Sequence, residues 1–151
     1  MLKNNFTSRE KLKVIANGSS NGINASYFDP ELFSANDKQT LKTNLGITPE
    51  DFVFIFVGRL VADKGINELI QAFQKIAEET NEVKLLLVGG FEPDLDPLEP
   101  ETLYEINANN KIISVGFQKE VRPYLAVGGC LAFPSYREGF PNVVMQAGAM
   151  G

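Results

Sequence analysis

Short runs of consecutive apolar residues alternate along this chain with segments in which apolar residues recur at spacings of three and four. Four of these runs are too short for helices and are rich in β-branched and aromatic residues, which is typical of strands buried on both faces of a sheet. The predicted strands are DFVFIFVG at 51–58, VKLLLVGG at 83–90, KIISVG at 111–116 and CLAFPS at 130–135.

The helical spacing is clearest after the first run, where residues 66–77 predict an amphipathic helix of about four turns. Earlier in the chain, Ser34 followed by Asp37 predicts a capped helix that runs to about Asn44 and is closed by Gly46. Further helical segments are expected at 103–108, at 119–128 and at 143–151.

Strands that alternate with helices in this way predict an α/β fold, a Rossmann-like parallel sheet with helices on both faces. The 151 residues suffice for one ordinary domain. Residues 1–30 hold a cluster of Gly, Asn and Ser and are predicted to be a linker that leads into the domain, which occupies 31–151. Because the chain ends at Gly151, just after a new helix opens, we expect the domain to be incomplete and truncated at its C-terminus.

Composition and charge argue against several kinds of partner and active site. The chain is 44% apolar and carries a net charge of −5, which argues against nucleic acid or an anionic membrane as its partner. It has one cysteine and no histidine, so an internal disulfide, a usual zinc site and a Ser-His-Asp or Cys-His nucleophile are excluded. No secretory signal or membrane-spanning run is visible, and we expect the protein to be cytoplasmic.

The end of the first predicted strand holds a candidate anion site. Ligands of open parallel sheets bind beyond the carboxyl ends of the strands, where Gly58, Arg59 and Lys64 precede the helix at 66–77. Two cations beside a helix N-terminus would suit a phosphate group. Neither a P-loop nor a G-x-G-x-x-G fingerprint is present. The alternative is that both cations are surface residues paired with an acid nearby, Asp63 or Glu68.

The segment EGFPNVVMQ at 138–146 is the second candidate. We expect Asn142 to cap a helix that begins at Val143, and Glu138 and Gln146 to face one cleft, where they suit a hydroxyl-rich ligand. The alternative is an ordinary capped helix with a surface glutamate. The acidic, proline-broken run at 92–105 is expected to be a solvated loop, since its spacing does not fit a metal site.

Three segments together resemble a known family. FVGRLVADKGINELIQAF at 56–73 and FPSYREGFPNVVMQAGAMG at 133–151 are similar to the C-terminal, donor-binding domain of family 4 (group 1) retaining glycosyltransferases of the GT-B type. VIANGSSNGINASYFDP at 14–30 resembles the linker of the members that build bacterial surface polysaccharides. The resemblance implies that 31–151 is a nucleotide-sugar (donor) binding domain, the C-terminal half of a GT-B fold.

The resemblance also implies roles for single residues. Arg59 and Lys64 would hold the donor diphosphate and offset charge on the leaving nucleotide, and Glu138 would bind hydroxyls of the donor sugar, so these three are the candidate catalytic residues. The main chain near Val115 would line the base pocket, and Gln146 stands where the family has a second glutamate that binds the ribose. The candidate donor-binding residues are Gly58, Val115, Gly139, Phe140, Pro141, Asn142 and Gln146.

Two positions depart from the family's pattern. A neutral Gln146 in place of a carboxylate would weaken donor binding by about 1 kcal/mol. Gly148 stands where the family usually carries Met, and it would loosen the last helix by up to about 1 kcal/mol.

By the same resemblance, the full-length protein would move a hexose from a nucleoside-diphosphate sugar to a glycan or lipid-linked acceptor with retention, in capsular, exo- or lipopolysaccharide biosynthesis. No metal or other cofactor is expected, since two cations and a helix terminus would stabilise the leaving group. The acceptor would bind an N-terminal domain that this chain lacks, so we expect the fragment alone to be inactive. We expect no membrane contact from this fragment, while a peripheral position at the inner face of the membrane stays open for the full-length protein.

Two alternatives stay open at this point. The chain could be a non-catalytic module that binds a nucleotide-sugar or a phosphate. The other, weaker alternative is a phosphate-binding enzyme on the same scaffold, such as a GT-B nucleotide-sugar epimerase. Such enzymes rely on additional ionisable groups, and this chain has no histidine to serve.

Overall fold

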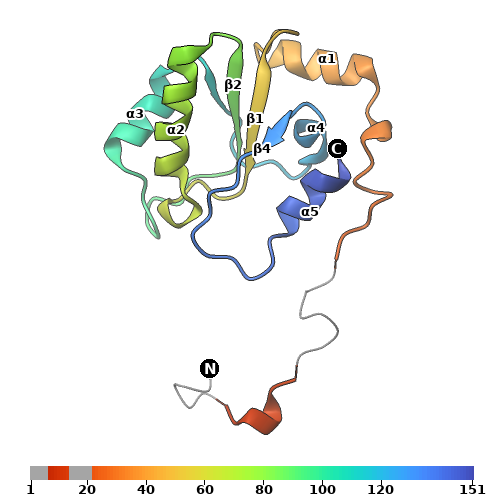
Figure 1. Ribbon diagram of the computed structural model, residues 1–151, viewed down its shortest axis with the longest axis vertical. Coiled ribbons are helices and arrows are strands. Elements are labelled where there is room, and N and C mark those ends of the chain that lie inside the picture. The colour runs from red at the N-terminus through yellow and green to blue at the C-terminus, as the bar shows by residue number, and fades with distance from the viewer. Residues whose placement is uncertain (1–6, 14–21) are drawn as a thin grey trace.

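The computed structural model describes residues 7–13 and 22–151. Four parallel strands form one sheet in the order β3-β2-β1-β4, and Figure 1 shows β1 and β2 at its centre. The strands are β1 at Phe52–Val57, β2 at Val83–Val88, β3 at Ile112–Ser114 and β4 at Cys130–Leu131. The α/β fold with a parallel sheet is therefore confirmed.

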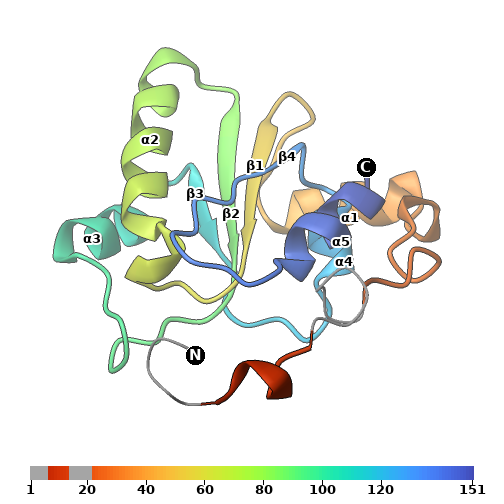
Figure 2. The ribbon, with the colours of Figure 1, turned by 60° about the horizontal axis from the view of Figure 1, so that its bottom comes forward.

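Helices cover both faces of the sheet, as predicted. Figure 2 shows α2 and α3 on one side of the strands and α1, α4 and α5 on the other. Their bounds are α1 Ala35–Asn44, α2 Ile66–Glu79, α3 Pro100–Ala108, α4 Arg122–Leu125 and α5 Asn142–Ala149, with short 3-10 turns η2 at Arg9–Lys11, η3 at Pro30–Leu32 and η4 at Ala62–Lys64. Among the residues that the structure describes, no helix is both long and apolar enough to cross a bilayer.

The two faces of the sheet carry separate hydrophobic cores because side chains alternate along each strand. On one face, Phe56 and Leu85 pack with Ile70 and Phe73 of α2. On the other face, a core is built from β1, β2 and the helices α1, α4 and α5. Its buried members are Ile47, Val53, Ile55, Leu86, Val88, Leu125, Val127 and Met150.

The first helix is closed at both ends as the sequence predicts. The Ser34 side chain accepts from the Asp37 backbone, and the Asp37 side chain accepts from the Ser34 backbone, which completes a capping box. At the other end, Gly46 adopts a φ of 68°. Its N–H bonds to Thr43 O at 3.1 Å, and the N–H of Ile47 bonds to Lys42 O at 2.9 Å, which is the Schellman pattern.

Several predicted boundaries differ from the structure, and the helix expected at 119–128 covers only Arg122–Leu125. The fourth strand covers only Cys130–Leu131, because β4 pairs with β1 at Phe54 and Ile55 alone. Helix α3 begins at Pro100, three residues earlier than expected, because proline is well suited to the first turn. The expectation that Asn142 caps α5 is wrong: the helix begins at Asn142, Pro141 precedes it, and no side chain caps it.

Glycines let the backbone segments at the carboxyl edge of the sheet approach closely. A Cβ on Gly89 would lie 1.7 Å from Gly58 O, so β1 and β2 end with their main chains in contact. Gly65, just before α2, has a φ of 71°, and a Cβ there would lie 2.4 Å from Pro134 O. The segment that follows β4 therefore passes directly over the start of α2, which brings two distant parts of the sequence together at this edge.

Candidate functional site

Two hollows open at the carboxyl ends of the strands, and both are lined by Val57 and Gly58. The first has a volume of about 270 Å³ and contains Lys64 and Glu138. Its other lining residues are Phe56, Phe133, Phe140, Pro141, Asn142 and Val143. The second has a volume of about 210 Å³ and contains Arg59. Ligands of parallel sheets bind at this edge, so these hollows are the candidate site.

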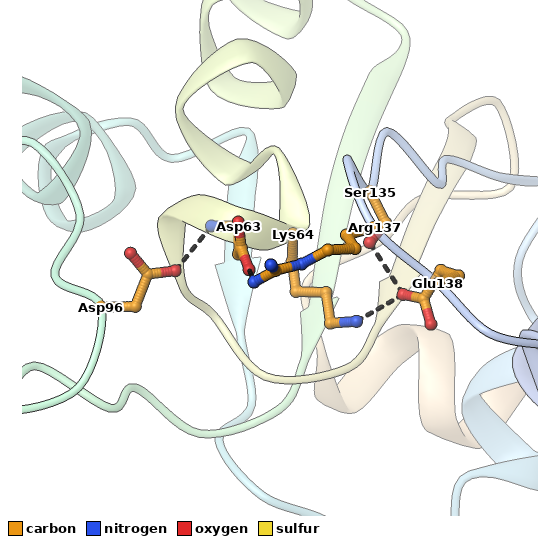
Figure 3. Close-up of polar contacts among 6 residues, drawn as sticks. All are labelled: Asp63, Lys64, Asp96, Ser135, Arg137 and Glu138. Carbon is orange, nitrogen blue, oxygen red and sulfur yellow. Dashed lines mark hydrogen bonds and ion pairs between the residues drawn. The ribbon is translucent and has the colours of Figure 1, made fainter. Parts of the chain in front are cut away.

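Lys64 and Glu138 form an ion pair in the first hollow (Figure 3). Lys64 is the last residue of η4, and Glu138 lies in the loop between β4 and α5. Their side chains are only 19% and 26% exposed. The Ser135 hydroxyl donates to the same Glu138 oxygen at 2.7 Å. The hydrogen bond from Lys64, together with the one from Ser135, lowers the pKa of Glu138, so the carboxylate is charged near neutral pH.

Arg59 lies beside this hollow and not in it. Its guanidinium donates to Glu92 Oε2 at 2.7 Å, and its side chain is 57% exposed. The hydrogen bond from the guanidinium to Glu92 raises the pKa of Arg59 further. The structure thus places the two cations in neighbouring hollows that share Gly58, each with a carboxylate partner.

The start of α5 lines the first hollow as well. Pro141, Asn142 and Val143 face it, and within the described chain no side chain caps this helix. Uncapped amides at a helix N-terminus favour a negatively charged group. Lys64 adds a full positive charge opposite them. This hollow therefore combines donors for an anion with one carboxylate, Glu138, that can accept from hydroxyl groups.

The remaining candidate residues, Val115, Gly139 and Gln146, line neither hollow. Gly139 and Gln146 are not among the residues that line the hollow containing Glu138. The expectation that Glu138 and Gln146 face one cleft is therefore not met in this hollow. The N–H of Val115 donates to Leu87 O at 3.1 Å, and its carbonyl accepts from the Gln118 side chain at 2.7 Å. The neighbouring residues Phe117 and Gln118 line the second hollow instead.

Sequence reasoning missed the partners of several charges. The acids considered as partners for the two cations, Asp63 and Glu68, bind elsewhere: Asp63 pairs with Arg137 at 2.6 Å, and Glu68 accepts from the Tyr136 hydroxyl at 2.7 Å. The acidic loop was expected to be solvated. Its acids are indeed exposed or half-buried, but two of them also contact the site region. Glu92 pairs with Arg59, and Asp96 accepts from the Asp63 N–H at 2.6 Å.

No local sequence signal could identify these partners, because each pair joins residues more than thirty positions apart. As for metals, no group of three or more potential ligands from His, Cys, Asp and Glu comes together within 7–13 and 22–151.

Comparison with known proteins gives consistent matches. Residues 51–151 match the family model described as glycosyl transferases group 1. The capsular polysaccharide biosynthesis glycosyltransferase CapM of Staphylococcus aureus is 31% identical over 150 residues, which cover 99% of this chain and 38% of CapM.

Solved structures agree with this result. Anabaena Alr3699/HepE, crystallised with UDP and glucose, matches with a TM-score of 0.73 at 25% identity over 86% of this chain and 35% of that chain. The C-terminal domain of LpcC from Francisella tularensis has the same fold, with a TM-score of 0.69 at 19% identity over 85% of this chain and 66% of that domain. The chain thus spans little more than a third of the length of CapM and of HepE.

Proposed function

The chain belongs to the group 1 glycosyltransferases and has the fold of their C-terminal GT-B domain, and from this premise we propose a specific reaction. The whole protein transfers a hexose from a nucleoside-diphosphate sugar to a glycan or lipid-linked acceptor with retention of the anomeric configuration. The product belongs to a surface polysaccharide. CapM of S. aureus, named for capsular polysaccharide biosynthesis, supports this assignment.

The observation that carries the proposal is the pairing of Lys64 and Glu138 in one hollow with the uncapped start of α5. A nucleoside-diphosphate sugar presents a diphosphate next to hydroxyl groups. Lys64 and the helix amides suit the diphosphate, and Glu138 suits the sugar hydroxyls. On binding, the diphosphate takes over Lys64 as its counter-ion, and Glu138 turns from the ammonium group to the sugar.

The work that falls to these residues is electrostatic. The bond between the anomeric carbon and the β-phosphate oxygen breaks while the acceptor hydroxyl bonds to that carbon and passes its proton to an oxygen of the leaving β-phosphate. Negative charge then builds on the leaving diphosphate, and Lys64 stabilises this charge from a fixed position. Arg59 joins it once the diphosphate displaces Glu92 from the guanidinium. A metal ion is not required under this proposal, so EDTA is expected to leave nucleotide binding unchanged.

The decisive experiment is a calorimetric titration with UDP, GDP, ADP and their sugars. Alr3699/HepE was crystallised with UDP and glucose, so we expect UDP and UDP-glucose to bind in preference to the other bases. If none of these compounds binds, the proposed function is wrong. Binding of another base would keep the enzyme class and change only the donor.

We further propose that residues 1–151 bind the donor without transferring sugar. The chain spans 38% of CapM, and the acceptor of the whole protein is expected to bind the remainder. Incubation of the chain with UDP-glucose and a glycan acceptor should release no UDP. Release above the rate of spontaneous hydrolysis would contradict this part of the proposal. Binding by the whole protein without any turnover would favour the non-catalytic module.

A further inference from the structure

A tandem of two ion pairs joins the turn before α2 to the loop before α5. Asp63 and Lys64 are adjacent in η4, and Arg137 and Glu138 are adjacent in the loop. Asp63 pairs with Arg137 at 2.6 Å, and Lys64 pairs with Glu138. Figure 3 shows both pairs side by side between the two segments. Along the chain, an acid precedes a base at residues 63–64, and a base precedes an acid at residues 137–138. Both ion pairs can therefore form in only one alignment of the two segments.

Backbone contacts fix the same register. The N–H of Tyr136 donates to Asp63 O at 3.1 Å. The Asp63 N–H is in turn held by the Asp96 carboxylate at 2.6 Å, so the turn is anchored from the opposite side (Figure 3). The Tyr136 hydroxyl adds a contact to Glu68 of α2 at 2.7 Å. Asp63 is therefore the residue on which these contacts meet, through its N–H, its carbonyl and its carboxylate.

The two ion pairs differ in their surroundings. The Lys64 and Glu138 side chains are 19% and 26% exposed and lie in the hollow, whereas those of Asp63 and Arg137 are 52% and 81% exposed and lie outside it. A ligand that binds Lys64 breaks the inner ion pair, which is the one between Lys64 and Glu138. Neither Asp63 nor Arg137 lines the hollow, so the outer pair is expected to stay intact when a ligand binds there.

We propose that Asp63 is a positioning residue of the donor site, which holds the Ser135–Glu138 loop against the start of α2 through Arg137 and Tyr136 while the ligand replaces Glu138 at Lys64. This inference rests on the proposed function, because it assigns the replacing ligand as a nucleoside diphosphate. Asp63 acts through the loop and does not touch the ligand.

Charge and position give Asp63 opposite effects on the binding of an anion. An acid near a diphosphate site weakens binding by repulsion, so removal of Asp63 should tighten binding if only its charge mattered. If Asp63 holds the loop, its removal weakens binding. Exposed ion pairs contribute little free energy. We therefore expect Asp63→Ala to increase the dissociation constant of the nucleotide by about three- to fivefold.

The test uses calorimetric titration of UDP, GDP and ADP into the intact protein and its variants. Asp63→Ala is compared with Asp94→Ala, which removes the same charge from an exposed position of the acidic loop. We expect weaker binding for Asp63→Ala and unchanged or slightly tighter binding for Asp94→Ala. The exchanged pair Asp63→Arg with Arg137→Asp keeps the local net charge and should restore the dissociation constant to within about twofold of the wild type.

Hydrogen exchange supplies a readout that does not depend on a ligand. The Tyr136 amide, which bonds to Asp63 O, should exchange faster in Asp63→Ala and at the wild-type rate in Asp94→Ala and in the exchanged pair. If Asp63→Ala fails to fold, Asp63→Asn serves in its place, since it removes the charge and keeps the shape.

The outcomes separate the two proposals. Wild-type affinity or tighter binding in Asp63→Ala, when the wild-type protein binds a nucleotide, overturns the positioning role and leaves the proposed function intact. Absence of nucleotide binding by the wild-type protein overturns the proposed function and this inference with it. Weaker binding that the exchanged pair does not restore also overturns the positioning role, because the pairing with Arg137 is then not the cause.

Discussion

The ammonium group of Lys64 contacts the carboxylate of Glu138, 74 positions further along the chain. The contact joins the turn that precedes α2 to the loop that precedes α5. Because both side chains lie in the same hollow, a ligand that enters it meets a cation and an acid that already neutralise one another. Under the proposed function, donor binding is an exchange of partners, which the predictions for Lys64 and Gln146 test; those for Gly65, Gly148 and Glu120 test the fold.

Replacement of Lys64 by alanine should raise the donor KM and lower kcat of the whole enzyme. Hydrogen bonds to charged groups contribute roughly 1.5–3 kcal/mol, so the loss in kcat/KM should be about tenfold or more. The matched control is Lys38→Ala, on α1 beside Phe52 at the start of β1, which should behave as the wild type. Values of KM and kcat that both stay within about twofold of wild type would show that Lys64 does not hold the diphosphate.

Gly65→Ala and Gly148→Ala should change stability in opposite directions. Gly65 has a left-handed backbone, and a Cβ there meets Pro134 O at 2.4 Å, so the substitution should cost about 2 kcal/mol or more. Gly148 lies inside α5 with no atom near its would-be Cβ, so alanine there should stabilise by roughly 0.5–1 kcal/mol. Urea denaturation measures both. A neutral Gly65→Ala would mean that the chain after β4 does not pass over the start of α2.

Gln146→Glu should strengthen donor binding. The resemblance to the family implies that this position lies at the ribose, although Gln146 does not line the hollow that contains Glu138. A carboxylate there would accept hydrogen bonds more strongly than an amide, by about 1 kcal/mol or close to fivefold in affinity. Gln71→Glu, at an exposed position of α2, adds the same charge elsewhere and should have no effect. Calorimetric titration with UDP-glucose measures the donor affinity of both variants and of the wild type. Equal or weaker binding by Gln146→Glu would place the ribose away from this position.

Stability in acid should depend on Glu120. Its hydrogen bonds from Arg122 lower the pKa of Glu120 from 4.5 to about 2. A lowered pKa in the folded state stabilises the protein above pH 4.5, and this contribution is lost as the pH falls from 4.5 toward 2.

Glu120→Gln should therefore lower stability at pH 7, by about 1 kcal/mol once solvent screening of this partly exposed group is included. The difference from wild type should shrink as the pH falls toward 2. Thermal unfolding between pH 7 and pH 2 measures it, with Glu79→Gln, at an exposed position of α2, as control. A constant difference over this range would contradict the assignment.

The hydrophobic pattern was sufficient to predict the strands, the long helix α2 and the placement of helices on both faces, because burial and backbone geometry impose their own periods on the sequence. The capping box of α1 was equally visible, since Ser34 and Asp37 need only each other. Local rules failed where pairing or helix initiation decides the boundary. Examples are β4, which is limited by its few partners on β1, and Asn142, which opens α5 instead of capping it.

The amino-acid sequence by itself determined the fold class, the family and the strand ends at which the candidate residues lie, because periodicity, turns and motifs are local properties of the chain. Only the tertiary structure decided which charges meet. Lys64 pairs with Glu138, Arg59 with Glu92 and Asp63 with Arg137. These choices depend on how two separate crossovers pack at one edge of the sheet, and the energy of an ion pair depends on distance in space, which no spacing along the chain can specify.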